Sequence, residues 1–240
     1  MTCLSRRVTL KNNHSKKKKV VVFAPHPDDE TFGCGGTIAK KIREGYEIIV
    51  VVITDGRNAF RIVLGINSEP TPYELREIRR SEAERAIGIL GVPKENIFFL
   101  DFEDGTLHDN EQKAEDIVTG ILAENCPDEI YLPYKNECNP DHQTTNKIVK
   151  DSIRKLCAFN STYQYTIAQR HSQVASILNA LSNLWKHNMI YVDISDFLDA
   201  KKRAIKEYES QVAIISGRQS RPIMENVHIF LKKKEVFFVD

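Results

Sequence analysis

A histidine and three acidic residues crowd into one short motif near the start of the chain. Residues 25–30 read PHPDDE and directly follow the apolar run 20–23. Adjacent carboxylates repel each other unless a cation or a proton relieves them. His26 and Asp29 could therefore bind one metal ion, zinc being the ion that favours such ligands, while Asp28 accepts a proton from a metal-bound water. The alternative is an acidic turn in which the histidine is a cap or a hydrogen-bonded core residue.

The residues around this motif predict the elements that position it. The run 20–23 is typical of a strand covered on both faces, which we expect at about 19–24. Open α/β sheets place their sites at the carboxyl ends of such strands, where this motif falls. A glycine-rich turn leads into a predicted helix at about 35–44 and a second strand at 48–53, which completes a right-handed βαβ unit. The glycines do not fit the dinucleotide pattern G-x-G-x-x-G, so close packing beside the motif explains them better.

The rest of the chain continues the alternation of strands and helices. Residues 57–72 carry little pattern and several turn-forming residues, so we expect a surface loop that could wall a pocket. Residues 227–240 alternate around a lysine-rich turn and predict a terminal hairpin. We predict the α/β class: a single Rossmann-like three-layer domain over 19–240, with a mostly parallel central sheet, helices on both faces and a C-terminal β-hairpin, after a basic N-terminal arm at 1–18. The further predicted strands are 96–100, 129–133, 162–168 and 189–194, and the further predicted helices are 73–90, 110–124, 141–157 and 172–186.

Composition argues against several classes of protein. The chain has 240 residues, 41% of them hydrophobic, which suits one sizeable domain. The net charge is +1 and the lysine run 16–19 is best interpreted as a solvated arm, so we expect no nucleic-acid partner. No apolar run approaches the roughly 20 residues of a membrane span, and we expect no signal peptide. The five cysteines are scattered without a CxxC pair, which predicts reduced thiols and a cytoplasmic protein. The oligomeric state stays open, and a homo-oligomer is compatible with the sequence.

The motif at 25–30, placed after an apolar strand and before a glycine-rich turn, resembles the first motif of the LmbE/PIG-L family. Members of that family are zinc-dependent N-deacetylases that act mostly on N-acetylglucosamine-type groups. By position, the resemblance implies that His26 and Asp29 are zinc ligands and that Asp28 is the general base. It also implies a Zn²⁺ cofactor, although a His/Asp/His set would take other first-row ions according to their availability.

A second motif resembles the same family about a hundred residues later. Residues 139–142 read Asn-Pro-Asp-His, where the family has H-x-D-H. Pro140 suits the first turn of the helix that begins here, and parallel topology brings that turn to the same edge of the sheet as the first motif. The resemblance implies that His142 is the third zinc ligand and that Asp141 is the acid beside it in the catalytic site.

The first position of the second motif departs from the family. Asn139 stands where relatives usually have a histidine that is thought to stabilise the oxyanion of the tetrahedral intermediate. Asparagine cannot become positively charged, but its amide can donate a hydrogen bond. One such donor lowers a barrier by about 3 kcal/mol. Three interpretations stay open: a working donor, a different substrate, or a weakened enzyme.

Two later segments add weaker support. Arg79 and Glu82 lie three apart on the predicted helix 73–90, and alone they read as a surface ion pair worth about 0.3 kcal/mol. The family has R-x-x-E at this place, and the resemblance implies that Arg79 reaches the substrate pocket. The late segment containing Lys201 and Ser210 matches the family's "DIS…K…SQ", and we expect it to hold a helix against the site edge.

Together these residues predict a zinc-dependent hydrolase that removes the N-acetyl group from an N-acetylglucosamine-type sugar conjugate. The runner-up is a metal-dependent amide hydrolase that acts on a non-sugar substrate, because pocket loops set that choice. A third hypothesis, kept open by Asn139, is a non-catalytic metal- or nucleotide-binding module. Protection of the protein by adenine nucleotides without amide cleavage would favour the third.

Overall fold

The centre of the fold is a seven-stranded sheet in the order β3-β2-β1-β4-β5-β7-β6. The computed structural model describes residues 17–157, 161–167 and 188–239. Strands β1 to β5 run parallel, and β7 runs antiparallel to both β5 and β6. The strands are β1 Lys19–Ala24, β2 Glu47–Thr54, β3 Ile97–Phe102, β4 Glu129–Pro133, β5 Ser161–Tyr165, β6 Asn188–Asp193 and β7 Lys234–Val239.

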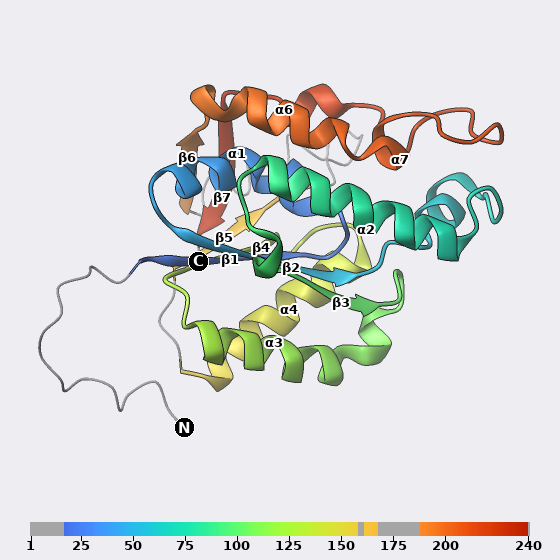
Figure 1. The fold of residues 1–240 in the computed structure, drawn as a ribbon. Coiled ribbons are helices and arrows are strands. Elements are labelled where there is room, and N and C mark those ends of the chain that lie inside the picture. The colour runs from blue at the N-terminus through green and yellow to red at the C-terminus, as the bar shows by residue number, and fades with distance from the viewer. Residues whose placement is uncertain (1–16, 158–160, 168–187, 240) are drawn as a thin grey trace, which may run out of the picture.

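Helices cover both faces of this sheet (Figure 1), with α1, α2 and α6 on one face and α3 and α4 on the other. Alternation along β1 separates the two cores, because Val20 and Val22 pack into one and Val21 and Phe23 into the other. The helices are α1 Asp29–Arg43, α2 Pro72–Ile89, α3 Glu111–Asn125, α4 Pro140–Lys155, α6 Leu198–Lys206 and α7 Glu209–Val212.

The strand order has its switch point between β1 and β4. Successive crossovers place β2 and β3 on one side of β1 and β4 and β5 on the other. At such a switch point the connections leave in opposite directions, and open α/β sheets bind ligands there. Both predicted motifs follow these two strands, since α1 begins just after β1 and α4 just after β4.

The predicted α/β class, the mostly parallel sheet and the helices on both faces are confirmed. The first strand lies where it was expected, at Lys19–Ala24. The predicted C-terminal β-hairpin is wrong. Residues Val227–Phe230 form a 3-10 helix, and β7 lies between β5 and β6 instead. An isolated hairpin is marginal in water, whereas this insertion pairs both edges of β7 and buries Phe237 completely.

Two other predictions need adjustment, and some fall outside the described residues. Helix α1 begins at Asp29 rather than near residue 35, and the expected loop at 57–72 contains a π-helix at Phe60–Leu64. The helix predicted at 172–186 and most of the arm at 1–18 lie outside the described residues. The division of the chain into that arm and a domain at 19–240 stays a prediction.

Helix α1 is broken at Cys34, and a buried ion pair supports the break. Cys34 has φ −144° and ψ 20°, so the backbone hydrogen bonds of the helix are interrupted there. The Glu235 carboxylate on β7 accepts hydrogen bonds from the backbone N–H groups of Gly36 at 2.9 Å and Thr37 at 2.8 Å. Lys201 of α6 donates to Glu235 at 2.6 Å and to the carbonyl of Phe32 at 2.8 Å, which satisfies the other side of the break.

Candidate active site

Three side chains from the two motifs converge at the carboxyl ends of β1 and β4. The Nδ1 atom of His26 lies 3.1 Å from Oδ2 of Asp29 and 3.2 Å from Nε2 of His142. The same Asp29 oxygen lies 3.2 Å from Nε2 of His142, so the three atoms form a nearly equilateral triangle. All three side chains are buried. The fold therefore brings together the three residues that the sequence named as metal ligands.

The spacing of this triangle fits a tetrahedrally coordinated ion. Bonds of roughly 2.0 Å from zinc to nitrogen or oxygen place two tetrahedral ligands roughly 3.3 Å apart. The edges of 3.1 to 3.2 Å between His26, Asp29 and His142 lie close to that value. Two imidazole nitrogens and a carboxylate oxygen are also a donor set that zinc binds, with a fourth position left for water. The three residues therefore fit a metal ion.

The other nitrogen of His26 faces two further carboxylates. Its Nε2 atom lies 3.3 Å from Oδ1 of Asp104 and 3.4 Å from Oδ2 of Asp141. Backbone N–H groups already hold both acids: Asn58 donates to Asp104 at 3.1 Å, and Gly105 donates to Asp141 at 2.7 Å. A ligating histidine commonly donates its second N–H to a carboxylate, which fixes its orientation. His26, Asp104 and Asp141 could also hold an ion by distance alone, but this supporting role accounts for them better.

The charges in this cluster perturb one another strongly. Burial alone would raise the pKa of Asp29, but the charge of His142 and hydrogen bonds from both histidines hold this pKa well below its usual range. Burial alone would lower the pKa of His26, but hydrogen bonds to Asp104, Asp141 and Asp29 raise it well above its usual value. The cluster therefore favours a positive charge among its carboxylates, which a proton or a metal ion can supply.

Asp28 lies next to the triangle on a strained backbone. Its φ of 133° falls in a region that residues with a side chain rarely adopt, and such strain clusters at functional sites. Burial raises the pKa of Asp28 well above its usual range, and the nearby charge of Arg79 counteracts this only in part. A buried carboxylate with a perturbed pKa beside a potential metal site is a good candidate for a general base.

Arg79 contacts this aspartate rather than open solvent. Its side chain is 3% exposed, and its Nη2 atom lies 3.1 Å from Oδ2 of Asp28. It also donates to the backbone carbonyls of Pro27 at 2.7 Å and Gly56 at 3.0 Å. Gly56 has φ +65°, and an added Cβ there would lie 2.3 Å from the guanidinium. The prediction that Arg79 binds substrate stays a prediction, while these contacts anchor the turn that carries Asp28.

Asn139 is the N-cap of α4 and lies three residues before His142. Its Oδ1 atom accepts a hydrogen bond of 2.8 Å from the backbone N–H of Asp141, the usual geometry of a helix N-cap. The side chain is half-buried, and its amide nitrogen donates to none of the described residues. The cap therefore occupies the oxygen and leaves the N–H₂ group able to donate to a ligand.

Sequence reasoning did not find every residue of this site. Asp104 is not among the residues that the sequence predicts for the site, and its position just after β3 was the available signal. The contacts of the late segment agree with its predicted positioning role, since Ser210 donates to Glu82 through its backbone N–H at 2.8 Å and its hydroxyl at 2.6 Å. These bonds join α7 to α2, the helix that carries Arg79.

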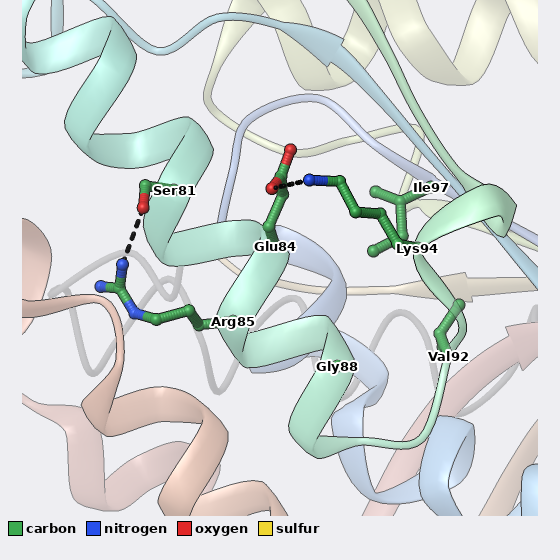
Figure 2. A pocket seen from close by; sticks show the side chains of 7 residues that line it. All are labelled: Ser81, Glu84, Arg85, Gly88, Val92, Lys94 and Ile97. Carbon is green, nitrogen blue, oxygen red and sulfur yellow. Dashed lines mark hydrogen bonds and ion pairs between the residues drawn. The ribbon is translucent and has the colours of Figure 1, made fainter.

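A separate hollow lies on the outer side of α2 (Figure 2). It extends to Ile97 at the start of β3, so it sits at the opposite edge of the sheet from the triangle. Its charged residues are paired, since Lys94 donates to Glu84 at 2.9 Å and Arg85 to Ser81 at 2.8 Å. This hollow offers no group for the chemistry of the two motifs, so the candidate active site is the cluster of His26, Asp29 and His142 at the carboxyl edge.

Comparison with known proteins agrees with this geometry. Residues 21–153 match the family model "PIG-L: GlcNAc-PI de-N-acetylase", and this span includes all the proposed ligands. The chain belongs to the PIG-L family. Membership identifies it as an N-deacetylase, a hydrolase of amide bonds. None of the helices in the described residues is long and apolar enough to cross a membrane.

Individual relatives of this PIG-L family member are named for related substrates. It is 35% identical over 202 residues to the diacetylchitobiose deacetylase of Thermococcus kodakarensis, covering 81% of this chain and 70% of the relative. It is 24% identical to a probable N-acetyl-alpha-D-glucosaminyl L-malate deacetylase 2 of Bacillus cereus, covering 91% of each chain. The structure of N,N'-diacetylchitobiose deacetylase from Pyrococcus horikoshii, in complex with its inhibitor MPG, superposes with a TM-score of 0.69 at 26% identity, covering 97% of this chain and 87% of that one.

Proposed function

We propose that this chain removes the N-acetyl group from an N-acetylglucosamine-type sugar and that it uses a zinc ion held by His26, Asp29 and His142. The observation that carries the proposal is the triangle of three ligand atoms with edges of 3.1 to 3.2 Å, with Asp28 beside it. A zinc ion bound there would polarise the acetamide carbonyl and lower the pKa of water to near neutrality.

The residues of the chain have distinct roles in this proposal. Asp28 accepts the proton as the water oxygen attacks the carbonyl carbon. It then donates that proton to the leaving nitrogen as the C–N bond breaks, so acetate and a free amino sugar are released. Arg79 orients the Asp28 carboxylate, and the amide of Asn139 donates to the oxyanion. Asp141, which the sequence placed among the catalytic residues, acts through His26 by fixing the orientation of its ring.

The substrate class is inferred from the relatives. The first compound to test is N,N'-diacetylchitobiose, because two of the relatives are deacetylases named for it. We propose a small acetylated sugar conjugate as the binding partner and expect no nucleic-acid partner. The oligomeric state stays open, and a homo-oligomer is compatible with the sequence. A cytoplasmic location stays a prediction, supported by the free thiols of Cys34 and Cys157.

The test measures acetate release from N,N'-diacetylchitobiose and other N-acetylglucosamine conjugates, using protein of known metal content with and without added zinc. We expect release that depends on zinc. The Asp28→Asn variant should keep the metal and lose activity by about 10²-fold or more. Near-normal turnover in that variant would refute the general-base role. Failure of reconstituted protein to bind zinc would refute the ligand assignment, and zinc-loaded protein that cleaves only non-sugar amides would favour the runner-up.

A further inference from the structure

Glu30 ends the first motif but contributes no atom to the triangle of metal ligands. Its side chain is completely buried. Its Oε2 atom accepts a hydrogen bond of 3.2 Å from the backbone N–H of Asp28. Its Oε1 atom accepts hydrogen bonds from the hydroxyl of Thr31, at 2.6 Å, and from the hydroxyl of Tyr208. A buried charge with this many donors has a fixed position.

The bond to Asp28 matters because that residue has an unfavourable backbone conformation. A φ of 133° persists only where the surroundings hold it. The carbonyl of Asp28 accepts from the backbone N–H groups of Thr31 and Phe32, both at 3.0 Å, and thereby starts α1. The N–H on the other side of the same residue is held by the Glu30 side chain. Glu30 therefore fixes the peptide whose rotation would move the Asp28 carboxylate.

Tyr208 connects this support to a distant part of the chain. It lies between α6 and α7, its ring is completely buried, and it packs near Phe32 with ring centroids 6.3 Å apart. Its hydroxyl donates to Glu30 from the side of α1 that faces α6. The hydroxyl thus limits where the Glu30 carboxylate can lie, and through it the Asp28 peptide.

We propose that Glu30 and Tyr208 are positioning residues that hold Asp28 in its strained, active conformation. This inference rests on the proposed general-base role of Asp28. Neither residue binds the metal or the substrate. Their loss lowers kcat while KM and zinc content stay unchanged, because a small misplacement of a catalytic group reduces the rate by up to about 10²-fold.

Three variants separate positioning from simple stability. Glu30→Gln keeps an oxygen to accept from the Asp28 N–H, and the two hydroxyls can rotate to accept from its amide, so its kcat should stay near wild type. Glu30→Ala removes the acceptor and should lower kcat by about 10- to 100-fold. Tyr208→Phe keeps the ring and removes one donor, so its kcat should fall between the two.

The matched control is Glu115→Ala. Glu115 is also buried and charge-paired, with Lys155 at 2.8 Å, but it lies on α3, on the far face of the sheet. It should lose stability without loss of kcat. A kcat near wild type in both Glu30→Ala and Tyr208→Phe, at normal zinc content, would overturn the inference.

A second measurement does not depend on turnover. In ¹H–¹⁵N spectra of the zinc-loaded protein, the Asp28 amide should exchange faster and shift in Glu30→Ala, stay close to wild type in Glu30→Gln, and be unaffected in Glu115→Ala. An Asp28 amide that is the same in wild type and Glu30→Ala would overturn the inference even if the wild type cleaves no acetamide. Absence of wild-type activity alone would instead refute the proposed function.

Discussion

Replacing Lys201 by methionine tests how the broken helix α1 is held. The side chains of Lys201 and Glu235 are 1% and 4% exposed, and their charged atoms lie 2.6 Å apart. Removing one partner of a buried ion pair leaves an uncompensated charge and costs about 3–5 kcal/mol. The bonds from Gly36 and Thr37 to Glu235 remain, so we expect the lower half of that range.

The loss can be measured by urea unfolding of the metal-free protein at pH 7, monitored by circular dichroism. Thermal unfolding of the same proteins gives a second readout: in a chain of this size each kcal/mol lowers Tm by about 2–4 °C, so Lys201→Met should lower Tm by at least about 6 °C. The control is Lys94→Met. Its side chain is 79% exposed in a surface pair with Glu84, and surface pairs contribute about 0–1 kcal/mol.

The double variant Lys201→Met with Glu235→Gln gives the sharper result. Neutralising Glu235 removes the uncompensated charge, while the glutamine oxygen can still accept from Thr37, so the double variant should be more stable than Lys201→Met alone. Two outcomes would refute the reasoning. One is a loss below about 1 kcal/mol in Lys201→Met, the level of an exposed pair. The other is a double variant that is less stable than Lys201→Met.

Three further predictions concern the site and its supports. Gly56→Ala should cost about 1–3 kcal/mol and lower kcat, because φ is +65° and the new Cβ would lie 2.3 Å from Arg79; urea unfolding and steady-state kinetics check it. Asn139→Asp should keep the cap on the Asp141 N–H and hence the Tm, but lose the amide donor and about 10²-fold in kcat; an unchanged kcat would remove the oxyanion role. Burial raises the pKa of Glu82 above 4.5, so the wild type should lose stability relative to Glu82→Gln as the pH rises from 4.5 through the raised pKa. A difference in unfolding free energy between the two proteins that does not change with pH would contradict this.

The parts of this protein that the sequence could predict depend on local patterns. The apolar run at Val20–Phe23 is a strand because its β-branched side chains are buried on both faces, and the motif after it must lie at a carboxyl edge. His26 and His142 are far apart along the chain, but parallel connections bring β1 and β4 side by side, so their meeting followed from topology. The predicted ligand set needed no knowledge of side-chain packing.

The parts that the sequence could not predict depend on long-range pairing. Glu235 lies in an alternating apolar stretch that reads equally well as half of a hairpin, and only the position of β7 between β5 and β6 brings it to the break in α1. Tyr208 likewise looks like an ordinary helix-end tyrosine until α6 packs on α1. Asp104 needed the register of the loop after β3 to reach His26. Each is a polar residue whose partner is set by tertiary structure, which local pattern does not encode.

Asn139 departs from the family motif but still caps helix α4. Asparagine is among the best N-cap residues, so this position meets the structural need of α4 through Oδ1. Holding the oxygen there also sets the direction of the amide N–H₂ group, which makes a neutral donor available where relatives usually have histidine. Because a neutral amide does not titrate, activity that relies on it should vary less with pH on the alkaline side than activity that relies on a charged imidazole, which loses its proton as the pH rises. The Asn139→His variant should therefore acquire an additional alkaline limb in its kcat profile near the ordinary histidine pKa of about 6.5, and identical profiles for the two proteins would argue that residue 139 does not contact the oxyanion.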